Sequence, residues 1–236
     1  MARSTPRESA VTAAFDRLQQ PSLRRDGERQ LPAGPKARRT RTALLDASRA
    51  LFAEHGYQTT TVADIIDRAG VSFGTFYQYF RGRSDVLGAL MTEYVAQLAE
   101  RTTSWTSTHG TDDLERMIRH FVAAYAGAAA LSGVWEEACH LDYDAAALRR
   151  DPGRMLTDGV ARELVRGGRS GRSRRFTPKE AELAARALTA MVDRYCYVTY
   201  VFDPPADGPP DAAESAKLLA ELWAGAIDLR DEPPVS

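Results

Sequence analysis

Apolar residues recur with a helical period along most of the chain, starting near Ala37. Apolar residues three and four positions apart form one face of a helix that is predicted from about Ala37 to Glu54, and His55-Gly56 ends it. The residues of this face are Leu44, Leu45, Ser48, Leu51 and Phe52. No alternating stretch is long enough for a β-strand, and no internal repeat is found, so the pattern predicts an all-α fold.

Two short helices are predicted next. The first opens after Thr61, which forms a capping box with Asp64, and closes at Gly70. The second runs from Ser72 through Phe80. Phe76 and Phe80, four residues apart, are predicted to face the core. The residues expected on the outer surface are Phe73, Thr75, Tyr77, Gln78 and Tyr79.

The rest of the chain is predicted to consist of longer helices. They cover about 85–101, 112 onward, 128–140, 144–165, 178–202 and 211–229. Asp151-Pro152-Gly153 interrupts the fourth of these, either as a capped first-turn proline or as a kink. Residues 166–175 are expected to form a flexible basic loop. A single stripe of large apolar side chains on the last helix comprises Leu218, Leu219, Leu222, Trp223, Ala226 and Ile227.

Charge is divided unevenly along a chain whose net charge is only −1. Residues 1–83 hold 14 Lys/Arg against 8 Asp/Glu, whereas the remaining residues hold 17 against 24. The basic N-terminal third and the acidic remainder suggest that any polyanion is bound by the N-terminal third. Residues 1–36, rich in Pro, Arg, Ser and Gln, are predicted to be a disordered basic arm.

Several classes of function are not favoured. Cys139 and Cys196 lack the spacing of a zinc site or a disulfide framework, so reduced thiols are expected. We expect no metal and no cofactor; Glu136, Glu137 and His140 are a weak candidate for a metal pair. No nucleophile, base or phosphate-binding motif indicates an enzyme. No apolar run reaches membrane-spanning length, and a cytoplasmic protein without membrane contact is expected.

Gly70-Val71-Ser72 joins the two short helices as the turn of a helix-turn-helix would. Glycine permits the left-handed backbone that leaves the first helix, and Ser72 can cap the second. The outer surface of the second short helix, with its tyrosines and glutamine beside Arg81 and Arg83, is typical of a surface that contacts DNA phosphates and fills a groove.

The stretch from Arg39 to Leu90 resembles the DNA-binding domain of TetR-family repressors. It includes LFAEHGYQTTTVADIIDRAGVSFGTFYQYFRGRSDVLGAL. The resemblance implies an all-α homodimer that binds double-stranded DNA at a palindromic operator. It also implies repression that a small molecule usually relieves. The main alternative is a ligand-independent architectural DNA-binding protein, which would lack an enclosed cavity.

The resemblance also implies roles for single residues. Those matching positions that contact phosphates are Thr61, Ser72, Thr75, Tyr77, Tyr79 and Arg83, the last standing where many relatives have lysine. Phe73, Gly74 and Gln78 match positions near base edges, although Phe73 can offer only an apolar contact to a thymine methyl. The basic segment that includes Arg38, Arg39 and Arg41 lies where relatives contact the backbone or minor groove.

Three regions are therefore expected: a disordered basic arm (1–36), a helix-turn-helix domain (37–83) and a helical ligand-binding and dimerisation domain (84–230). The ligand is expected to be small and hydrophobic or amphipathic. Candidate pocket residues are Trp105, Phe121, Tyr125, Trp135, His140, Tyr143 and Tyr195, with His140 or Tyr143 as polar anchor. Candidate dimer contacts are Leu188, Met191, Tyr195, Leu219, Leu222 and Trp223.

Overall fold

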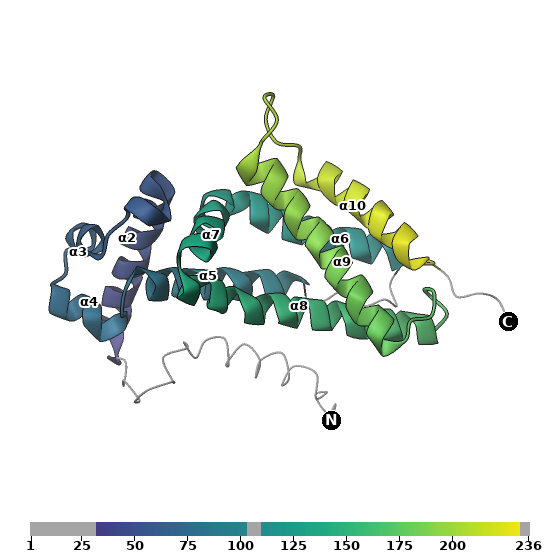
Figure 1. The fold of residues 1–236 in the computed structure, drawn as a ribbon, viewed down its shortest axis with the longest axis horizontal. Coiled ribbons are helices and arrows are strands. Elements are labelled where there is room, and N and C mark those ends of the chain that lie inside the picture. The colour runs from purple at the N-terminus through teal and green to yellow at the C-terminus, as the bar shows by residue number, and fades with distance from the viewer. Residues whose placement is uncertain (1–31, 103–109, 232–236) are drawn as a thin grey trace. The chain divides into compact units, whose positions relative to one another are not determined.

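The computed structural model describes residues 32–102 and 110–231, which are built from helices and turns without a β-strand (Figure 1). The predicted all-α fold is confirmed. The helices are α2 (Pro35–Thr59), α3 (Val62–Ala69), α4 (Phe73–Tyr79), α5 (Arg83–Thr102), α6 (Gly110–Gly127), α7 (Ala129–Leu141), α8 (Tyr143–Arg169), α9 (Pro178–Tyr197), the π-helix η2 (Val198–Phe202) and α10 (Ala212–Ile227). Most of the predicted N-terminal arm lies outside the described residues.

The described residues form two compact units. Unit 1 comprises residues 32–96 and 134–152, and unit 2 comprises the described residues of 97–133 and 153–231. Helices α5, α7 and α8 each contribute to both units. The compact units therefore do not divide at the domain boundary expected after Arg83, because unit 1 also takes in part of α5, the end of α7 and the start of α8.

In unit 1, α2 presents a continuous apolar face. The helix starts at Pro35, whose missing N–H costs nothing in a first turn. Its large buried side chains are Leu44, Leu45, Leu51 and Phe52. The helix bends at Gly56, where φ is 79°, a conformation that favours glycine. From α5, Val86, Leu87 and Leu90 are also buried, and from α7, Val134, Trp135 and Ala138.

Unit 2 is organised around one apolar cluster to which α6, α8, α9 and α10 all contribute. Helix α9 begins after a capping box at Thr177, in which Glu180 N–H donates to the Thr177 hydroxyl at 3.3 Å. Its buried residues recur every three or four positions: Ala181, Ala185, Leu188, Val192 and Cys196. Helix α10 packs along α6. The core of unit 2 therefore covers one face of α9 and one face of α10.

Two predictions about α8 are wrong. The backbone stays helical through Asp151-Pro152-Gly153 and onward to Arg169, so the predicted interruption does not occur. Losing the hydrogen bond at Pro152 is tolerated because Val160 and Leu164, beyond the proline, are buried in unit 2. The predicted basic loop is consequently shorter. It is also held in place, since Arg174 N–H donates to Ile227 O at 2.9 Å and Arg230 N–H to Arg172 O at 2.8 Å.

Candidate nucleic-acid interface

Helix α3 is fixed at both ends by local interactions. Thr61 accepts from Asp64 N–H at 3.2 Å, and Thr61 N–H donates to Asp64 Oδ2 at 2.8 Å. The Thr61 hydroxyl and backbone N–H hold the pKa of Asp64 below its ordinary value. At the other end Gly70 adopts a left-handed conformation with φ of 64°. The predicted capping box and glycine end are therefore confirmed, and Thr61 itself is exposed.

Helix α4 presents an exposed outer face. Ser72 caps it, accepting from Thr75 N–H at 3.2 Å. Phe76 is fully buried, whereas Phe73 is 57% exposed and Tyr77 43% exposed. Gln78 and Gly74 are also exposed, and Thr75 is half-buried. The outer face therefore offers an aromatic ring, a phenol and an amide side by side along two turns.

Tyr79 does not belong to this outer face. Only 7% of it is exposed, so its expected position on the surface is wrong. On a helix, residues three and four positions beyond a buried residue share its face. Tyr79 and Phe80 therefore share the inward face of Phe76, and both are buried.

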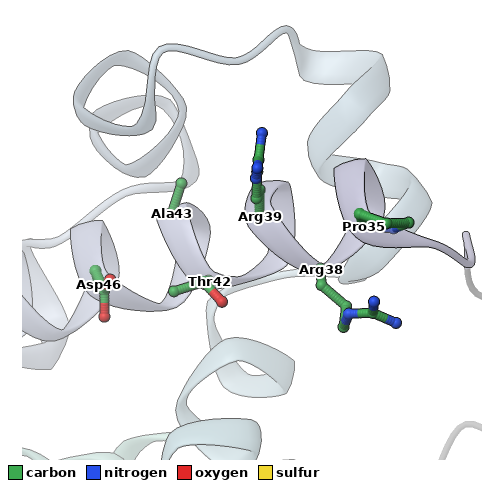
Figure 2. Close-up of a pocket in the computed structure, with 6 residues that line it drawn as sticks. All are labelled: Pro35, Arg38, Arg39, Thr42, Ala43 and Asp46. Carbon is green, nitrogen blue, oxygen red and sulfur yellow. The ribbon is translucent and has the colours of Figure 1, made fainter.

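The N-terminal half of α2 carries a second exposed basic surface. Arg38 and Arg39 are exposed and border a shallow, open hollow of about 480 Å³ with Pro35, Thr42, Ala43 and Asp46 (Figure 2). The two guanidinium groups extend away from each other in Figure 2. Arg41 is placed differently, because its Nη1 donates to Glu93 Oε1 at 2.9 Å. The hollow is too open to enclose a small ligand and suits a contact with a larger polyanion.

Arg83 is engaged inside unit 1. Its Nη1 donates to the carbonyl oxygens of Tyr57, Gln58 and Thr60 at 3.0, 2.9 and 3.1 Å. Its guanidinium also lies over the ring of Tyr57, 4.4 Å from the centroid. Nothing in the residue pattern predicts this arrangement, since the three acceptors are backbone atoms at least 23 residues away.

The candidate pocket residues are divided between the two units: Phe121, Tyr125 and Tyr195 pack in the apolar cluster of unit 2, whereas Trp135, His140 and Tyr143 belong to unit 1. Tyr125 and Trp135 are buried, Phe121 and Tyr195 are half-buried, and Trp105 lies outside the described residues. His140 is exposed and Tyr143 is 76% exposed, so neither is a buried polar anchor. Helix α7 buries Val134, Trp135 and Ala138, which leaves His140 on the opposite face.

Unit 2 contains a small apolar cavity that the sequence did not reveal. It has a volume of about 30 Å³ and is lined by Met117, Ile118, Phe121, Leu156, Val160, Thr189, Val192 and Trp223. Of the candidate pocket residues that the structure describes, only Phe121 lines it. Trp223 is 2% exposed, and its Nε1–H has no hydrogen-bond partner among the described residues. A buried N–H donor without a hydrogen-bond partner is uncommon in proteins, and the indole N–H is the only polar group of the Trp223 side chain.

The candidate dimer contacts fall into two groups. Leu188, Leu219 and Trp223 are buried within unit 2 itself, so their assignment to a dimer surface is wrong. Met191 and Tyr195 are half-buried, and the Tyr195 hydroxyl hydrogen-bonds with Ser215 Oγ at 2.9 Å. Leu222 is 53% exposed. The exposed leucines that the prediction missed are Leu183 on α9 (61%) and Leu218 on α10 (50%).

The described residues include no group of three His, Cys, Asp or Glu side chains arranged to hold a metal ion. The carboxylate of Glu137, part of the weak metal candidate, instead accepts from backbone N–H groups of unit 1. No single helix in the described ranges is long and apolar enough to cross a membrane. Helices α6 and α7, taken together as one bent pair, have the length and composition that a membrane span needs.

Residues 44–90 match the model of bacterial regulatory proteins of the tetR family. The matched range contains α3, the Gly70 turn and α4, whose caps and exposed face are described above. Residues 44–90 therefore form a DNA-binding domain similar to that of the TetR family. This confirms the resemblance inferred from the sequence.

Known relatives agree with this assignment. Over 58 residues, 25% of the chain and 30% of the relative, the chain is 40% identical to a fatty acid metabolism regulator protein of Bacillus subtilis. It is 30% identical to the HTH-type transcriptional repressor KstR2 of Mycolicibacterium smegmatis, covering 40% of the chain and 44% of the relative. The matched regions thus cover less than half the length of either relative.

Solved structures show the same fold over most of the chain. SmeT, the repressor of the Stenotrophomonas maltophilia multidrug efflux pump SmeDEF, aligns with a TM-score of 0.64 at 24% identity, covering 84% of this chain and all of SmeT. The fatty acid degradation regulator FadR from Bacillus halodurans aligns with a TM-score of 0.62 at 20% identity, covering 84% of this chain and all of FadR. The TetR fold therefore extends well beyond residues 44–90.

Proposed function

We propose that this protein is a one-component transcription regulator, most simply a repressor, which binds a palindromic site on double-stranded DNA as a homodimer. The observation that carries the proposal is the exposed outer face of α4 within the TetR-family domain. Phe73 and Tyr77 expose 57% and 43% of their surface although they are aromatic. An exposed aromatic and amide surface on a short helix, with basic residues on α2, suits a helix that enters the major groove.

Each residue of the interface has a distinct role in this proposal. Tyr77, Thr61 and Ser72 contact phosphates and set the position of the protein on the duplex. Gln78 reads a base edge by hydrogen bonds, and the Phe73 ring packs against a thymine methyl group. Arg38 and Arg39 add contacts to the backbone or minor groove. The proposed roles of Thr75 and Tyr79 are limited to their hydroxyl groups, because α4 turns the rest of these side chains inward.

A homodimer is supported by the exposed leucines of unit 2. Leu183, Leu218 and Leu222 are half or more exposed in the protomer, and Leu218 and Leu222 lie one turn apart on the same face of α10. Packing the same face of two copies against each other would cover them. The two α4 helices would then need to lie about 34–36 Å apart to enter successive major grooves.

Release by a small ligand is the remaining part of the proposal. Its support is the apolar cavity of unit 2 and the unpartnered Trp223 N–H. A cavity of about 30 Å³ holds roughly one water molecule, whereas pockets for drug-sized ligands enclose about 300–1,000 Å³. The ligand must therefore bind a conformation in which the lining helices have moved apart, and its affinity is reduced by the rarity of that conformation. SmeT has been solved in complex with triclosan, a small molecule.

The test is selection of fragments bound by the full chain from random double-stranded DNA, followed by binding measurements on the selected site. We expect an inverted repeat. Gln78→Ala should change the preferred sequence, whereas Tyr77→Phe should weaken binding to all sequences. Arg162→Gln, at an exposed residue of α8 in unit 2 outside the proposed interface, is the control and should bind as the wild type does. Failure to select any sequence would contradict the proposal.

A further inference from the structure

Residues 57–60 connect the bend of α2 to the start of α3 and are held by two side chains of opposite charge. On one side the Arg83 Nη1 donates to the carbonyl oxygens of Tyr57, Gln58 and Thr60 within 3.1 Å. The last carbonyl groups of a helix have no partner within the helix, and a cation is well suited to them. Arg83 therefore completes the C-terminal end of α2.

On the other side a carboxylate from a distant part of the sequence binds the same segment. Glu137, on α7, accepts from Tyr57 N–H at 2.8 Å and from Gln58 N–H at 3.0 Å. The approach is so close that a Cβ atom at Gly56 would lie 3.0 Å from Glu137 Oε2, and φ at Gly56 is 79°. Glycine at this position thus serves both the bend and the contact with Glu137.

The ring of Tyr57 lies between these charged groups. It is fully buried, its hydroxyl donates to Asp142 Oδ2 at 2.6 Å, and the Arg83 guanidinium lies over its face. Burial and the neighbouring Asp142 carboxylate raise the pKa of the Tyr57 phenol well above its ordinary value, so it remains a donor. Arg83, Glu137 and Asp142 thus fix the backbone and the side chain of one residue from three directions.

We propose that Arg83 and Glu137 are positioning residues for DNA binding, which hold residues 57–60 and hence the start of α3 at Thr61, and that Arg83 is not a phosphate contact. This inference rests on the proposed function. It departs from the role that the family resemblance implies for position 83. It also means that the end of α7, which lies outside residues 44–90, helps to position the DNA-binding helices through Glu137.

The Nη1 of Arg83 cannot serve both residues 57–60 and a phosphate. A guanidinium that turned to a phosphate would leave three backbone carbonyls without their donor, two of them in part-buried hydrogen bonds. Leaving a buried acceptor without a partner costs more than a typical hydrogen bond contributes. A lysine at this position would carry the charge but not the planar fork or the stacking on Tyr57.

Salt dependence separates a positioning role from a phosphate contact. Each phosphate neutralised by a protein cation contributes about 0.9 to the slope of log affinity against log salt concentration. We would measure this slope by fluorescence anisotropy on the selected DNA site for the full-length wild type, Arg83→Gln, Arg83→Lys and Glu137→Gln. Arg39→Gln is the matched comparison, because Arg39 is exposed on α2. Circular dichroism would establish that each variant is folded at the assay temperature.

We expect Arg83→Gln, Arg83→Lys and Glu137→Gln each to bind about tenfold more weakly or worse with an unchanged slope. The two glutamine variants lose charge-assisted hydrogen bonds, and Arg83→Lys loses the planar fork and the stacking on Tyr57. Arg39→Gln should lower the slope by about 0.9.

A purely structural role would lower the melting temperature and leave the affinity of the folded protein unchanged, which would overturn the inference. So would Arg83→Lys binding like the wild type, or a lower slope for Arg83→Gln. If the Arg83 variants do not fold, the affinity and salt slope of Glu137→Gln test the inference instead. Absence of specific binding by the wild type would instead contradict the proposed function.

Discussion

The exposed leucines of α10 allow the proposed dimer to be tested with one substitution. Leu222 is 53% exposed in the protomer, whereas its neighbour on the core side, Leu219, is only 1% exposed. Leu222→Asp should leave the protomer folded, because the carboxylate stays in water, but should disfavour association, because the dimer would bury it without a partner. Leu219→Asp is the matched control: it places the same group in the core and should unfold unit 2.

The size of the effect follows from the exposed fractions. Burying a whole leucine side chain contributes about 1.5–3 kcal/mol, so covering the exposed half of Leu218 or Leu222 contributes roughly 1 kcal/mol. A two-fold interface contains both leucines twice, which gives roughly 4 kcal/mol. Leu222→Asp removes about half of this and adds the desolvation of two carboxylates. The dimer dissociation constant should therefore rise at least about a hundredfold, since roughly 1.4 kcal/mol corresponds to a factor of ten.

Sedimentation equilibrium across a range of concentrations would measure association, and circular dichroism at the same temperature would measure helix content. We expect a dimeric wild type, a monomeric and helical Leu222→Asp variant, and a largely unfolded Leu219→Asp variant. If Leu222→Asp associates as tightly as the wild type, the exposed face of α10 is not the interface. A monomeric wild type at micromolar concentration would refute the dimer itself.

Three further predictions concern the interface and the helix caps. Replacing thymine by uracil in the selected site removes the 5-methyl group, so it should weaken wild-type binding at the thymine that Phe73 contacts but leave Phe73→Ala unaffected in anisotropy measurements. Thr177→Val removes a helix cap and should lower the free energy of unfolding by about 1 kcal/mol in urea titrations. The Thr177 N–H and hydroxyl hold the pKa of Glu180 below its ordinary value, and the variant loses only the hydroxyl. The part of the difference that comes from the hydroxyl's bond to the Glu180 carboxylate should therefore be present above the pKa of the unfolded state and be lost as pH falls, whereas the part from the lost cap should remain. Deleting residues 1–30, which carry several arginines, should lower both DNA affinity and its salt slope; an unchanged slope would show that the arm makes no phosphate contact.

Features whose partners lie within one turn of each other could be predicted from the sequence. The capping boxes at Thr61 and Thr177 each join residues three positions apart, so residue type and spacing are enough to identify them. Gly70 and Ser72 are similar, because a left-handed end and an N-cap depend on one side chain. The helix-turn-helix is assembled from these local features, which is why its limits were predicted closely.

Features that depend on which face of a helix meets a partner could not be predicted in the same way. The apolar stripe of α10 appeared to be one surface, but it divides into residues that enter the core, such as Leu219, and residues that remain exposed, such as Leu222. Adjacent positions on a helix differ by about 100°, so the position of the neighbouring α6 determines which leucine is covered. Hydrophobic pattern alone does not contain that information.

The charge division along the sequence also needs the structure before it can be interpreted. Several cations of the basic N-terminal third are engaged within unit 1: Arg41 pairs with Glu93, Arg49 with Asp46 and Glu93, and Arg68 with Glu54. Their charges are largely balanced by these carboxylates and contribute little to the attraction of a polyanion. Arg38 and Arg39 are exposed and form no ion pair among the described residues. The salt dependence of DNA binding should therefore come mainly from the start of α2 and the residues before it, while α4 supplies the contacts that distinguish one sequence from another.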